Sequence, residues 1–534
     1  MTRRKRLLLK VGAVLLSATV SGLGLGSGTR VDSAIVAQPV PPPVPNASKG
    51  STGPFACVIV VDAARYDEFN LSRMPNLAAL VARGTQFSQA WVGQLPSVTE
   101  SSHATIGTGV LPSRHLILGD TWRVPGTNSM APSLLGGSLV RTGYIGNSIR
   151  QTGSPTLAAL VHRAYPGSRV VALSGHKVYA ADALGAGDAD FVSFGEKNAL
   201  GHYIPAAIPG RVPDPKLLAS PQLNLPTYPR VPGVEDTWTT TLALKFLFNY
   251  HPRVMMINLP EVDVFGHMAG TDASIMTPLL TNVDRQIGRI VAAYARAGMI
   301  NNTTFVVTSD HGMVPALHTV SITRIENAIT SSGGQALYVG HGDYSPIWLK
   351  NASAVPKAAK ALADAAIPYV DAVYQKTPKG TYQLVSPVSR LADPYVRTSY
   401  SDLLSTANAA ESADIVLLYD ENTMTETPNF IQTKRKGDHG GATWGAQHIP
   451  LIVAGPAFKR AYTSSYPARL TDIAPTVETV MQIQPRGQDG VPLADAMIKP
   501  PAWALKQQDV AQPRMLSDVR GLENEAAIRP NIRR

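Results

Sequence analysis

Short apolar runs rich in β-branched residues alternate with helical stretches along most of the chain. The apolar runs predict buried strands at Phe55–Val61, Gly143–Gly146, Arg169–Leu173, Val254–Leu259, Thr304–Thr308, Asp414–Tyr419 and Pro450–Ala454. The stretches between them predict helices at Met74–Arg83, Glu100–Thr108, Glu235–Asn249, Ser274–Ala297 and Asp472–Gln482. Strands and helices in alternation indicate an α/β fold with a mainly parallel sheet and helices on both of its faces.

Two stretches interrupt this alternation. One is a proline-rich loop from Tyr203 to Val234, and the other, at residues 337–436, carries strands and a helix of its own. We interpret the second as a cap subdomain inserted late into a main domain formed by residues 53–336 and 437–499. Residues 500–534 form a polar C-terminal extension dotted with prolines, which we expect to pack loosely.

The N-terminus has the pattern of an export signal. A basic run at Arg3–Arg6 precedes a stretch without charge from Val11 to Thr29, and we assign the signal to residues 1–37. The pair Arg3–Arg4 favours the twin-arginine route. Residues 38–52 are proline-rich and predict an extended spacer. We therefore expect an exported protein, periplasmic or extracellular, that contacts a membrane only through this signal if the signal stays uncleaved.

Composition narrows the class of protein. With 534 residues, 44% of them hydrophobic, the chain is too apolar for disorder and can bury a large core. Cys57 is the single cysteine, which excludes an intramolecular disulfide. The net charge of +10 is concentrated in the signal and the C-terminal tail, and no repeats of aromatic and basic residues suggest nucleic-acid binding.

Acidic residues and histidines lie at the ends of the predicted strands. Because the carboxyl ends of parallel strands meet at one edge of the sheet, we expect these side chains to converge there. Three carboxylates and three imidazoles suit zinc and tolerate manganese, and six ligands fit two ions about 4 Å apart, as in sites of phosphoryl transfer. Each residue alone could equally be a helix cap or a packed histidine. The set is Asp62, Asp263, His267, Asp310, His311 and His439.

A candidate nucleophile lies in the run from Leu95 to Gly109. Thr99 follows a turn at Pro96 and begins a helix of small residues, where backbone N–H groups favour an anion. Coordination to a metal would lower the hydroxyl pKa and make Thr99 an attacking group. Capping the helix is the alternative role for Thr99. Three neighbouring serines are rivals that these arguments leave open: Ser97, Ser101 and Ser102.

The candidate ligands and the run around Thr99 lie in short motifs. The order of these motifs along the chain resembles that in the alkaline phosphatase superfamily, specifically in its type I phosphodiesterase and nucleotide pyrophosphatase branch. The resemblance implies an alkaline-phosphatase-like three-layer sandwich. It implies one zinc on Asp263, His267 and His439, and another on Asp62, Asp310, His311 and Thr99. It also selects Thr99 over the serines, with a phosphothreonine intermediate and a small phosphate ester or nucleotide as substrate. The matching runs are Val60–Arg65, Met74–Leu77, Thr99–Gly109, Asp263–His267, Thr308–Met313, Gly437–Gly441 and Asp472–Val477.

Two positions concern substrate binding. Relatives commonly carry an asparagine that donates to a phosphate oxygen where this chain has Asp120, and an ionised carboxylate cannot donate. Asp120 is therefore protonated, turned away, or neutralised by Lys177 or His176. Lys177 lies where some phosphomonoesterase relatives bind the dianion, although a solvated or structural lysine is an equal alternative. The run Lys434–Lys436 is typical of an exposed loop.

Three other functions compete with a phosphodiesterase. A phosphomonoesterase would use the same metals and nucleophile, with a basic residue on the phosphate oxygens. A sulfatase is disfavoured, because the sequence around Thr99 lacks the maturation context of a cysteine or serine nucleophile and Cys57 lies in a predicted strand. A non-catalytic exported surface protein, or a purely structural two-metal site, is the third alternative. The non-catalytic protein would have lost ligands, and none is lost.

Overall fold

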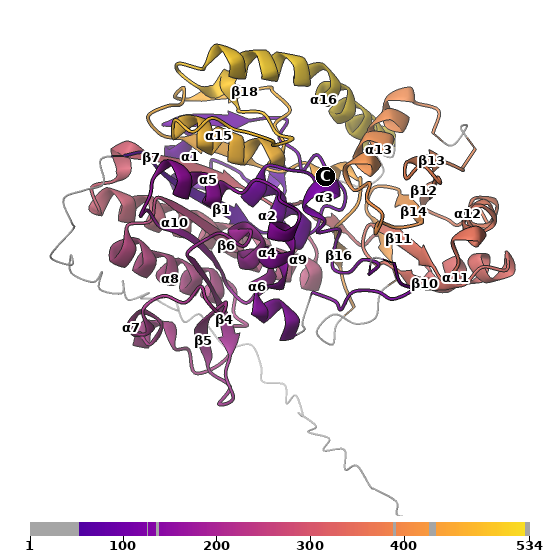
Figure 1. Cartoon of the computed structure of the whole chain (residues 1–534), viewed down its shortest axis with the longest axis horizontal. Helices are drawn as coiled ribbons and strands as arrows, with labels where there is room; N and C mark the ends of the chain where they lie inside the picture. Colours follow the sequence, from indigo (N-terminus) through magenta and orange to yellow (C-terminus); the bar gives the residue numbers. More distant parts are fainter. Residues whose placement is uncertain (1–52, 125, 135–137, 388–390, 427–433, 529–534) are drawn as a thin grey trace, which may run out of the picture. The chain divides into compact units, whose positions relative to one another are not determined.

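In the computed structural model, the largest sheet has nine strands (Figure 1). In spatial order its strands are β18 (Tyr462–Ser464), β2 (Gly84–Phe87), β17 (Leu451–Ala454), β7 (Thr303–Thr308), β1 (Phe55–Val61), β6 (Val254–Leu259), β3 (Val170–Ser174), β4 (Phe191–Lys197) and β5 (Tyr203–Ala207). The strands from β7 to β4 are parallel, whereas β17 and β5 pair antiparallel with their neighbours. The predicted mainly parallel sheet is confirmed.

The structure describes residues 53–124, 126–134, 138–387, 391–426 and 434–528. The predicted export signal at residues 1–37 and the spacer at 38–52 lie outside these ranges. Among the described residues, none of the helices has both the length and the apolar character that a bilayer span requires.

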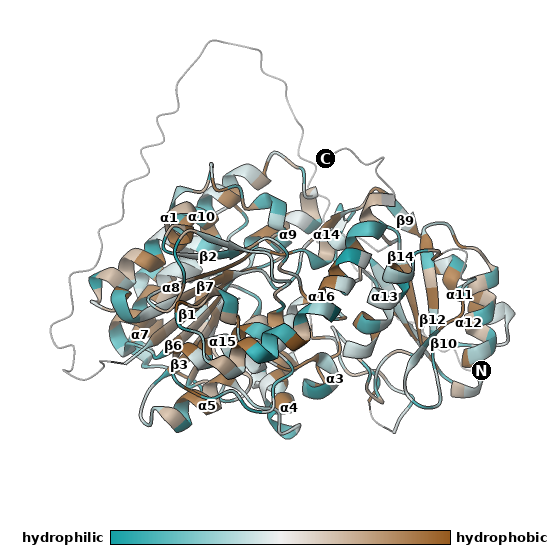
Figure 2. Ribbon diagram, turned by 90° about the horizontal axis from the view of Figure 1, so that it is seen from above, coloured by the Kyte–Doolittle hydropathy of each residue, from teal (hydrophilic) through white to brown (hydrophobic). Residues whose placement is uncertain are grey.

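Helices cover both faces of the sheet. Along β1, Val58 and Val60 point into one core cluster, whereas Cys57 and Ile59 point into another, as the two-residue period of a strand requires. Figure 2 shows the apolar strands lying between the two helical layers. The first cluster contains α2 (Thr99–Thr108), α4 (Tyr144–Gln151), α5 (Leu157–Ala164), α6 (Val178–Gly185) and α15 (Ile473–Val480). The second contains α1 (Pro75–Val81), α8 (Val234–Tyr250) and α10 (Met276–Arg296). The fold is thus a three-layer sandwich.

A second, antiparallel sheet is built from residues 336–419. Its order is β10 (Ala336–Val339), β11 (Tyr344–Leu349), β14 (Ile415–Tyr419), β12 (Val370–Lys376) and β13 (Tyr382–Leu384). One face packs on α11 (Ile322–Ser331) and α12 (Val355–Asp364). The other packs on α13 (Pro394–Thr406) and α16 (Ala502–Ile528). Two of these helices, α11 and α16, come from outside residues 337–436.

The remaining elements are short and connect the two sheets or line their edges. They are the helices α3 (Pro112–His115), α7 (Pro215–Leu218), α9 (Glu261–Ala269) and α14 (Trp444–Gln447), and the strands β8 (Val314–Pro315), β9 (His318–Val320), β15 (Thr423–Thr425) and β16 (Gly437–Asp438). Single turns of 3₁₀ helix lie at Tyr66–Glu68, Ser138–Thr142, Pro221–Leu223, Ile300–Asn302, Ala352–Ala354, Leu470–Asp472 and Ala494–Ala496.

Three local predictions are wrong. The proline-rich stretch from Tyr203 to Val234 was predicted as a loop, but it begins with β5, the edge strand that pairs antiparallel with β4. Residues Gly143–Gly146 were predicted as a strand but form the start of α4, because Ile145 and Ile149 are one helical turn apart and both enter the core. The C-terminal extension does not pack loosely between residues 502 and 528. Val519 and Leu522 of α16 are each 1% exposed and pack with α13 and the small sheet.

The close contact between α16 and α13 gives the first testable prediction. A Cβ at Gly521 would collide with Ser399 Oγ and the Tyr395 carbonyl oxygen, so Gly521→Ala should lower the free energy of unfolding by about 2 kcal/mol. In an unpacked helix the same change would stabilise by about 1 kcal/mol. Chemical denaturation checks the sign, with Val510→Ala as control because Val510, on the same helix, is 76% exposed. An unchanged or raised stability of Gly521→Ala would contradict the packing.

Candidate active site

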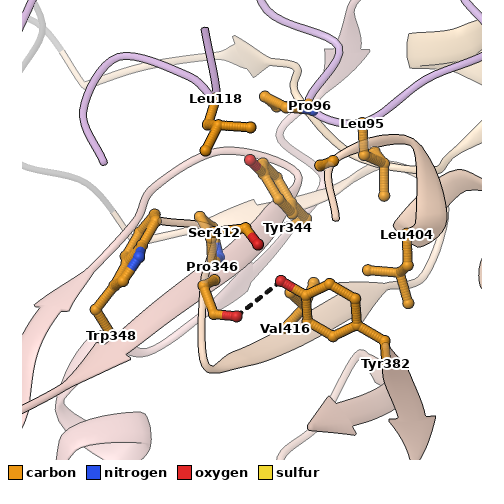
Figure 3. A pocket seen from close by; sticks show the side chains of 12 residues that line it. Leu95, Pro96, Leu118, Tyr344, Pro346, Trp348, Tyr382, Leu404, Ser412 and Val416 are labelled. Atoms are coloured by element: carbon orange, nitrogen blue, oxygen red, sulfur yellow. Dashed lines mark hydrogen bonds between the residues drawn. The ribbon is translucent and has the colours of Figure 1, made fainter. Parts of the chain in front are cut away.

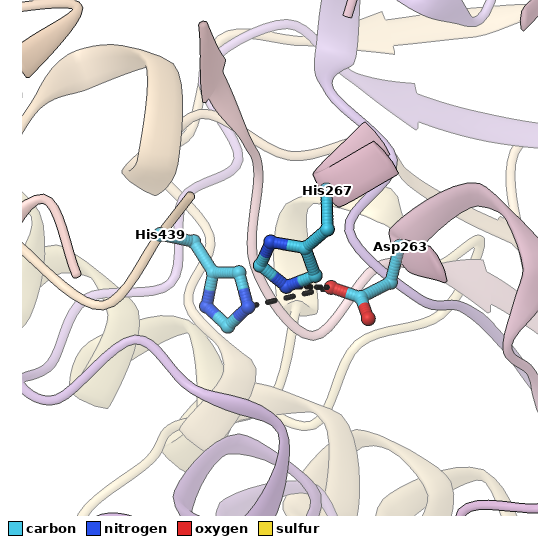
Figure 4. A group of neighbouring side chains, drawn as sticks. All are labelled: Asp263, His267 and His439. Atoms are coloured by element: carbon cyan, nitrogen blue, oxygen red, sulfur yellow. Dashed lines mark ion pairs between the residues drawn. The ribbon is translucent and has the colours of Figure 1, made fainter. Parts of the chain in front are cut away.

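The predicted ligands converge at the carboxyl edge of the parallel strands. Asp62 follows β1, Asp310 and His311 follow β7, and α9 brings Asp263 and His267 from the end of β6. His439 comes from the loop after β16. The ligand atoms of Asp263, His267 and His439 lie within 4.8 Å of one another (Figure 4). Those of Asp62, Asp263 and His311 are equally close to one another. The sequence therefore identified residues that the fold does bring together.

Backbone carbonyls orient the three imidazoles. The Nδ1 atoms of His267, His311 and His439 lie 2.8, 2.9 and 3.2 Å from the carbonyl oxygens of Gly437, Gly312 and Ser97. A carbonyl only accepts, so each Nδ1 must carry a proton, and each Nε2 is the ring nitrogen that remains to face a carboxylate or a metal ion. Burial lowers the pKa of His311 to about 3, which keeps that ring neutral and able to bind a metal.

The buried carboxylates fit a pair of divalent cations. Asp263 and Asp310 are almost fully buried, and Asp263 Oδ1 and Asp310 Oδ2 accept no hydrogen bond from any described residue. These oxygens lie 3.2 to 3.3 Å from imidazole Nε2 atoms, with Asp263 Oδ1 near His267 and His439 and Asp310 Oδ2 near His311. Mixed oxygen and nitrogen donors facing one another in this way make a site for metal ions.

Thr99 points its hydroxyl into this site. It is the first residue of α2, and its Oγ1 lies 3.3 Å from His311 Nε2 and 3.4 Å from Lys177 Nζ. The helix cap position is Val98, so capping does not occupy the Thr99 hydroxyl. Two rival serines face elsewhere, since Ser97 Oγ donates to Gly441 and Ser101 Oγ to Ile117.

Lys177 lies deeper in the site than a solvated lysine would. Its Nζ is 2.7 Å from Asp62 Oδ1 and 2.6 Å from Asp263 Oδ2, and the residue is 3% exposed. Although burial lowers the pKa of Lys177, these two carboxylates raise it well above its ordinary value. The ammonium group therefore joins the two predicted metal clusters and reaches the nucleophile.

Asp120 lies beside a second carboxyl group that the sequence reasoning missed. Burial and the neighbouring Asp120 raise the pKa of Glu100 well above its ordinary value, and burial also raises the pKa of Asp120. Of the proposed neutralising groups, Lys177 binds Asp62 and Asp263, and the ring of His176 lies 2.9 Å from Glu235. The sequence did not single out Glu100, because an acidic residue in the first turn of a helix is common and interacts favourably with the helix N-terminus.

Other functional neighbours were also missed. His103 offers a nitrogen to Asp62 and Asp310 in a third cluster of possible ligands, and Asn258 Nδ2 donates to Asp62 Oδ2 at 2.9 Å. Arg435, assigned to an exposed loop, donates to both carboxylate oxygens of Asp438 at 2.8 and 2.7 Å. Asn258 could have been found from the sequence, because it is the one polar residue inside the apolar run of β6.

A small apolar pocket lies between the two sheets next to the nucleophile loop (Figure 3). Leu95, Pro96 and Leu118 line it from the main domain, and Tyr344, Trp348 and Tyr382 from the small sheet. The ring of Tyr344 also reaches toward the site, because a Cβ on Gly440 would meet it at 3.0 Å. The small sheet thus forms one wall beside the loops that carry Thr99 and His439.

Comparisons with known proteins agree with this geometry. Human ectonucleotide pyrophosphatase/phosphodiesterase family member 5 is 33% identical over 53 residues, so the match spans 10% of this chain and 11% of that protein. The inactive murine form of that protein in complex with AMP matches in structure with a TM-score of 0.57 and 18% identity, covering 85% of this chain and 99% of that one. Wild-type alkaline phosphatase PafA matches with a TM-score of 0.64 and 16% identity, covering 84% and 100%.

These structural matches establish the alkaline phosphatase fold. The family follows from the sequence itself, because the model of the type I phosphodiesterase / nucleotide pyrophosphatase family matches residues 56–442, well over half of the chain. The chain belongs to the type I phosphodiesterase / nucleotide pyrophosphatase family.

Proposed function

We propose that this protein is a metal-dependent phosphohydrolase of the phosphodiesterase and nucleotide pyrophosphatase type, with Thr99 as its nucleophile. The observation that carries the proposal is the position of Thr99 Oγ1. It lies at the N-terminus of α2, within 3.3 Å of His311 Nε2 and 3.4 Å of Lys177 Nζ, beside two clusters of buried acidic and imidazole ligands. AMP bound to a murine relative supports a nucleotide as one candidate substrate.

The residues would hold two zinc ions, with manganese as an alternative. Asp263, His267 and His439 would bind one ion, and Asp62, Asp310, His311 and Thr99 the other. When bound, such a pair supplies positive charge to both the attacking and the leaving oxygen of a phosphoryl transfer.

The chain's own groups then account for the rest of the reaction. Thr99 Oγ1 loses its proton and attacks phosphorus, and the bond from phosphorus to the oxygen of the leaving alcohol breaks as the phosphothreonine forms, so that this oxygen leaves and takes up a proton. Water then attacks the phosphothreonine, which breaks the bond from phosphorus to Oγ1, returns a proton to Thr99 and releases the phosphoryl product. The free N–H groups at the start of α2 favour the negative charge on the phosphoryl oxygens. The Lys177 ammonium group would stabilise the negative charge on the phosphoryl group, because it already contacts the nucleophile. Asn258 and the carbonyls behind the imidazoles hold the ligands in position.

A phosphomonoesterase is the second candidate function, and Lys177 is the observation that favours it. A basic group 3.4 Å from the nucleophile can contact an oxygen that only a monoester leaves unsubstituted. The non-catalytic alternative has less support, since every predicted ligand is present and converges. Export by the twin-arginine route remains a proposal that rests on Arg3–Arg4 and the stretch that follows.

Replacing the nucleophile tests the proposal directly. Thr99→Ala should lower kcat/KM for p-nitrophenyl phosphodiesters by at least about 10³-fold while the metal content is retained. Ser102→Ala is the matched control, because Ser102 is a buried rival hydroxyl on the same helix with no hydrogen-bond partner among the described residues. Steady-state kinetics and mass spectrometry of a quenched reaction give the readouts. Full activity in Thr99→Ala, or phosphorylation of a serine, would contradict the assignment.

Removing the metals tests the ligand set. Dialysis against a chelator should abolish hydrolysis, and zinc or manganese should restore it. The melting temperature should fall as well, because ligand at a hundred times its Kd stabilises the folded state by about 2.7 kcal/mol. Elemental analysis should find two ions per chain. Hydrolysis that survives complete chelation would rule out the metal-dependent mechanism.

Lys177 separates the two candidate reactions. If Lys177 contacts a phosphoryl oxygen, Lys177→Gln should lower kcat/KM for p-nitrophenyl phosphate about ten-fold more than for bis(p-nitrophenyl) phosphate, since the dianion loses more from a missing cation. Lys436→Gln, an exposed lysine of the loop before His439, is the control. Equal losses on both substrates would assign Lys177 a role in holding Asp62 and Asp263 instead.

A further inference from the structure

The loop that carries His439 is held from outside the main sheet. The turn between β10 and β11, in the insertion, lies with its residues 342–344 against residues 439–441 of this loop. A Cβ on Gly342 would come within 2.6 Å of the His439 carbonyl oxygen, and the Asp343 N–H donates to that same oxygen at 3.4 Å. The two backbones therefore meet here with no space for a side chain between them.

Asp343 binds this loop with both oxygens of its carboxylate. The Gly441 N–H donates to Oδ1 in a short contact, and the Thr443 hydroxyl donates to Oδ2 at 2.7 Å. Asp343 is 0% exposed, so these hydrogen bonds form where water does not compete with them. A Cβ on Gly441 would meet Asp343 Oδ1 at 2.9 Å. A glycine at this position therefore gives the carboxylate the space to approach the loop.

A second carboxylate of the insertion holds the residues that follow. Thr443 occupies the N-cap position of α14, but its hydroxyl does not cap the helix because it donates to Asp343. Glu421, which follows β14, takes over this role. Its two carboxylate oxygens accept from the N–H groups of Trp444 and Gly445, each at 2.9 Å. The insertion thus fixes both the loop and the start of α14.

The opposite side of the loop contacts the segment that leads to the nucleophile. The Ser97 N–H donates to the Gly440 carbonyl at 2.9 Å, and the Ser97 hydroxyl donates to the Gly441 carbonyl at 3.1 Å. The Ser97 carbonyl accepts in turn from His439 Nδ1. The loop therefore lies between the insertion on one side and, on the other, the segment that ends at Thr99.

We propose that Asp343 is a positioning residue of the metal site. It holds the His439 imidazole where this ring can share an ion with Asp263 and His267. The inference rests on the proposed function, because the ion belongs to that proposal. Without the carboxylate, two buried donors of the loop lose their acceptor, and the loop has to move before they can reach water. His439 moves with it, since one residue separates it from Gly441. The insertion then contributes to metal binding although it supplies no ligand.

Zinc binding tests this role without turnover. In competition with a chromophoric chelator the wild type should bind two ions, and Asp343→Ala should weaken one of them at least about ten-fold, the usual loss when the support of a ligand is removed. Asp343→Asn should stay within about three-fold of the wild type, because an amide can accept from the Gly441 N–H and donate to the Thr443 hydroxyl. Asp414→Ala is the matched control, because this buried acid beside the same sheet binds Arg123 instead of the loop. It should keep both affinities.

His439→Ala identifies the ion that is affected. Removal of this imidazole should weaken one zinc, and adding Asp343→Ala should cause little further loss, because the two changes act on the same interaction. Cobalt-loaded Asp343→Ala should also show an altered visible absorption spectrum, whereas cobalt-loaded Asp414→Ala should not. Wild-type affinity for both ions in Asp343→Ala, or losses that add in the double variant, would overturn the positioning role.

Thr443→Val keeps the proposal testable where Asp343→Ala does not fold. It removes the hydroxyl that donates to Asp343 Oδ2 and leaves the contact with Gly441 in place. The affinity for the same ion should then fall by about three-fold, because one of the two hydrogen bonds to the carboxylate is lost. An unchanged affinity in this variant would overturn the proposal in that case.

The two proposals fail in different ways. Wild-type protein that binds no zinc would overturn the proposed metal-dependent function and, with it, the role of Asp343. Two tightly bound ions in both the wild type and Asp343→Ala would overturn the role of Asp343 alone and leave the proposed function intact.

Discussion

Repulsion among three buried aspartates is the constraint that the rest of the site has to satisfy. Asp62, Asp263 and Asp310 approach one another where charges interact more strongly than in water. Two neighbouring groups reduce this repulsion. The Lys177 ammonium lies between Asp62 and Asp263, and the Ala63 N–H donates to Asp310 Oδ1 at 3.0 Å. The order β7-β1-β6-β3 brings these groups to one edge. The parallel sheet therefore brings the aspartates together and also places beside them the groups that reduce their repulsion.

Much of the fold could be predicted because its strands are buried on both faces and read as continuous apolar runs. This signal located β1, β6 and β7 almost to the residue. It failed at Gly143–Gly146, because four residues are too few to distinguish a strand from the first turn of a buried helix. It also failed for α16, whose polar sequence hid the few side chains, such as Val519 and Leu522, that pack on the small sheet.

The ligands could be predicted for a different reason. Aspartate and histidine are typical metal ligands, and Asp62 and Asp310 stand out because each directly follows a mainly apolar run that predicts a strand. Glu100 and Arg435 do not stand out, because an acid at a helix start and a base in a loop are common everywhere. Only tertiary contact distinguishes them, when burial removes water from Glu100 and brings Asp120 against it. Residues that act through partners distant in sequence have no local pattern to detect.

The predicted metal ligands and the groups around Glu100 and Asp120 come from different parts of the chain. Five of the six predicted ligands follow strands β1, β6 and β7 of the main sheet, whereas His439 comes from the loop after β16 and Thr99 begins α2. The groups around Glu100 and Asp120 come from α6, from the loop before His439 and from Tyr338 and Tyr344 of the small sheet. The small sheet is held against the main domain by apolar contacts that include Leu95 and Trp348. A change in the strands of the small sheet can thus alter the charge and shape beside the loops that carry Thr99 and His439 without moving the ligands, because no predicted ligand lies on the small sheet.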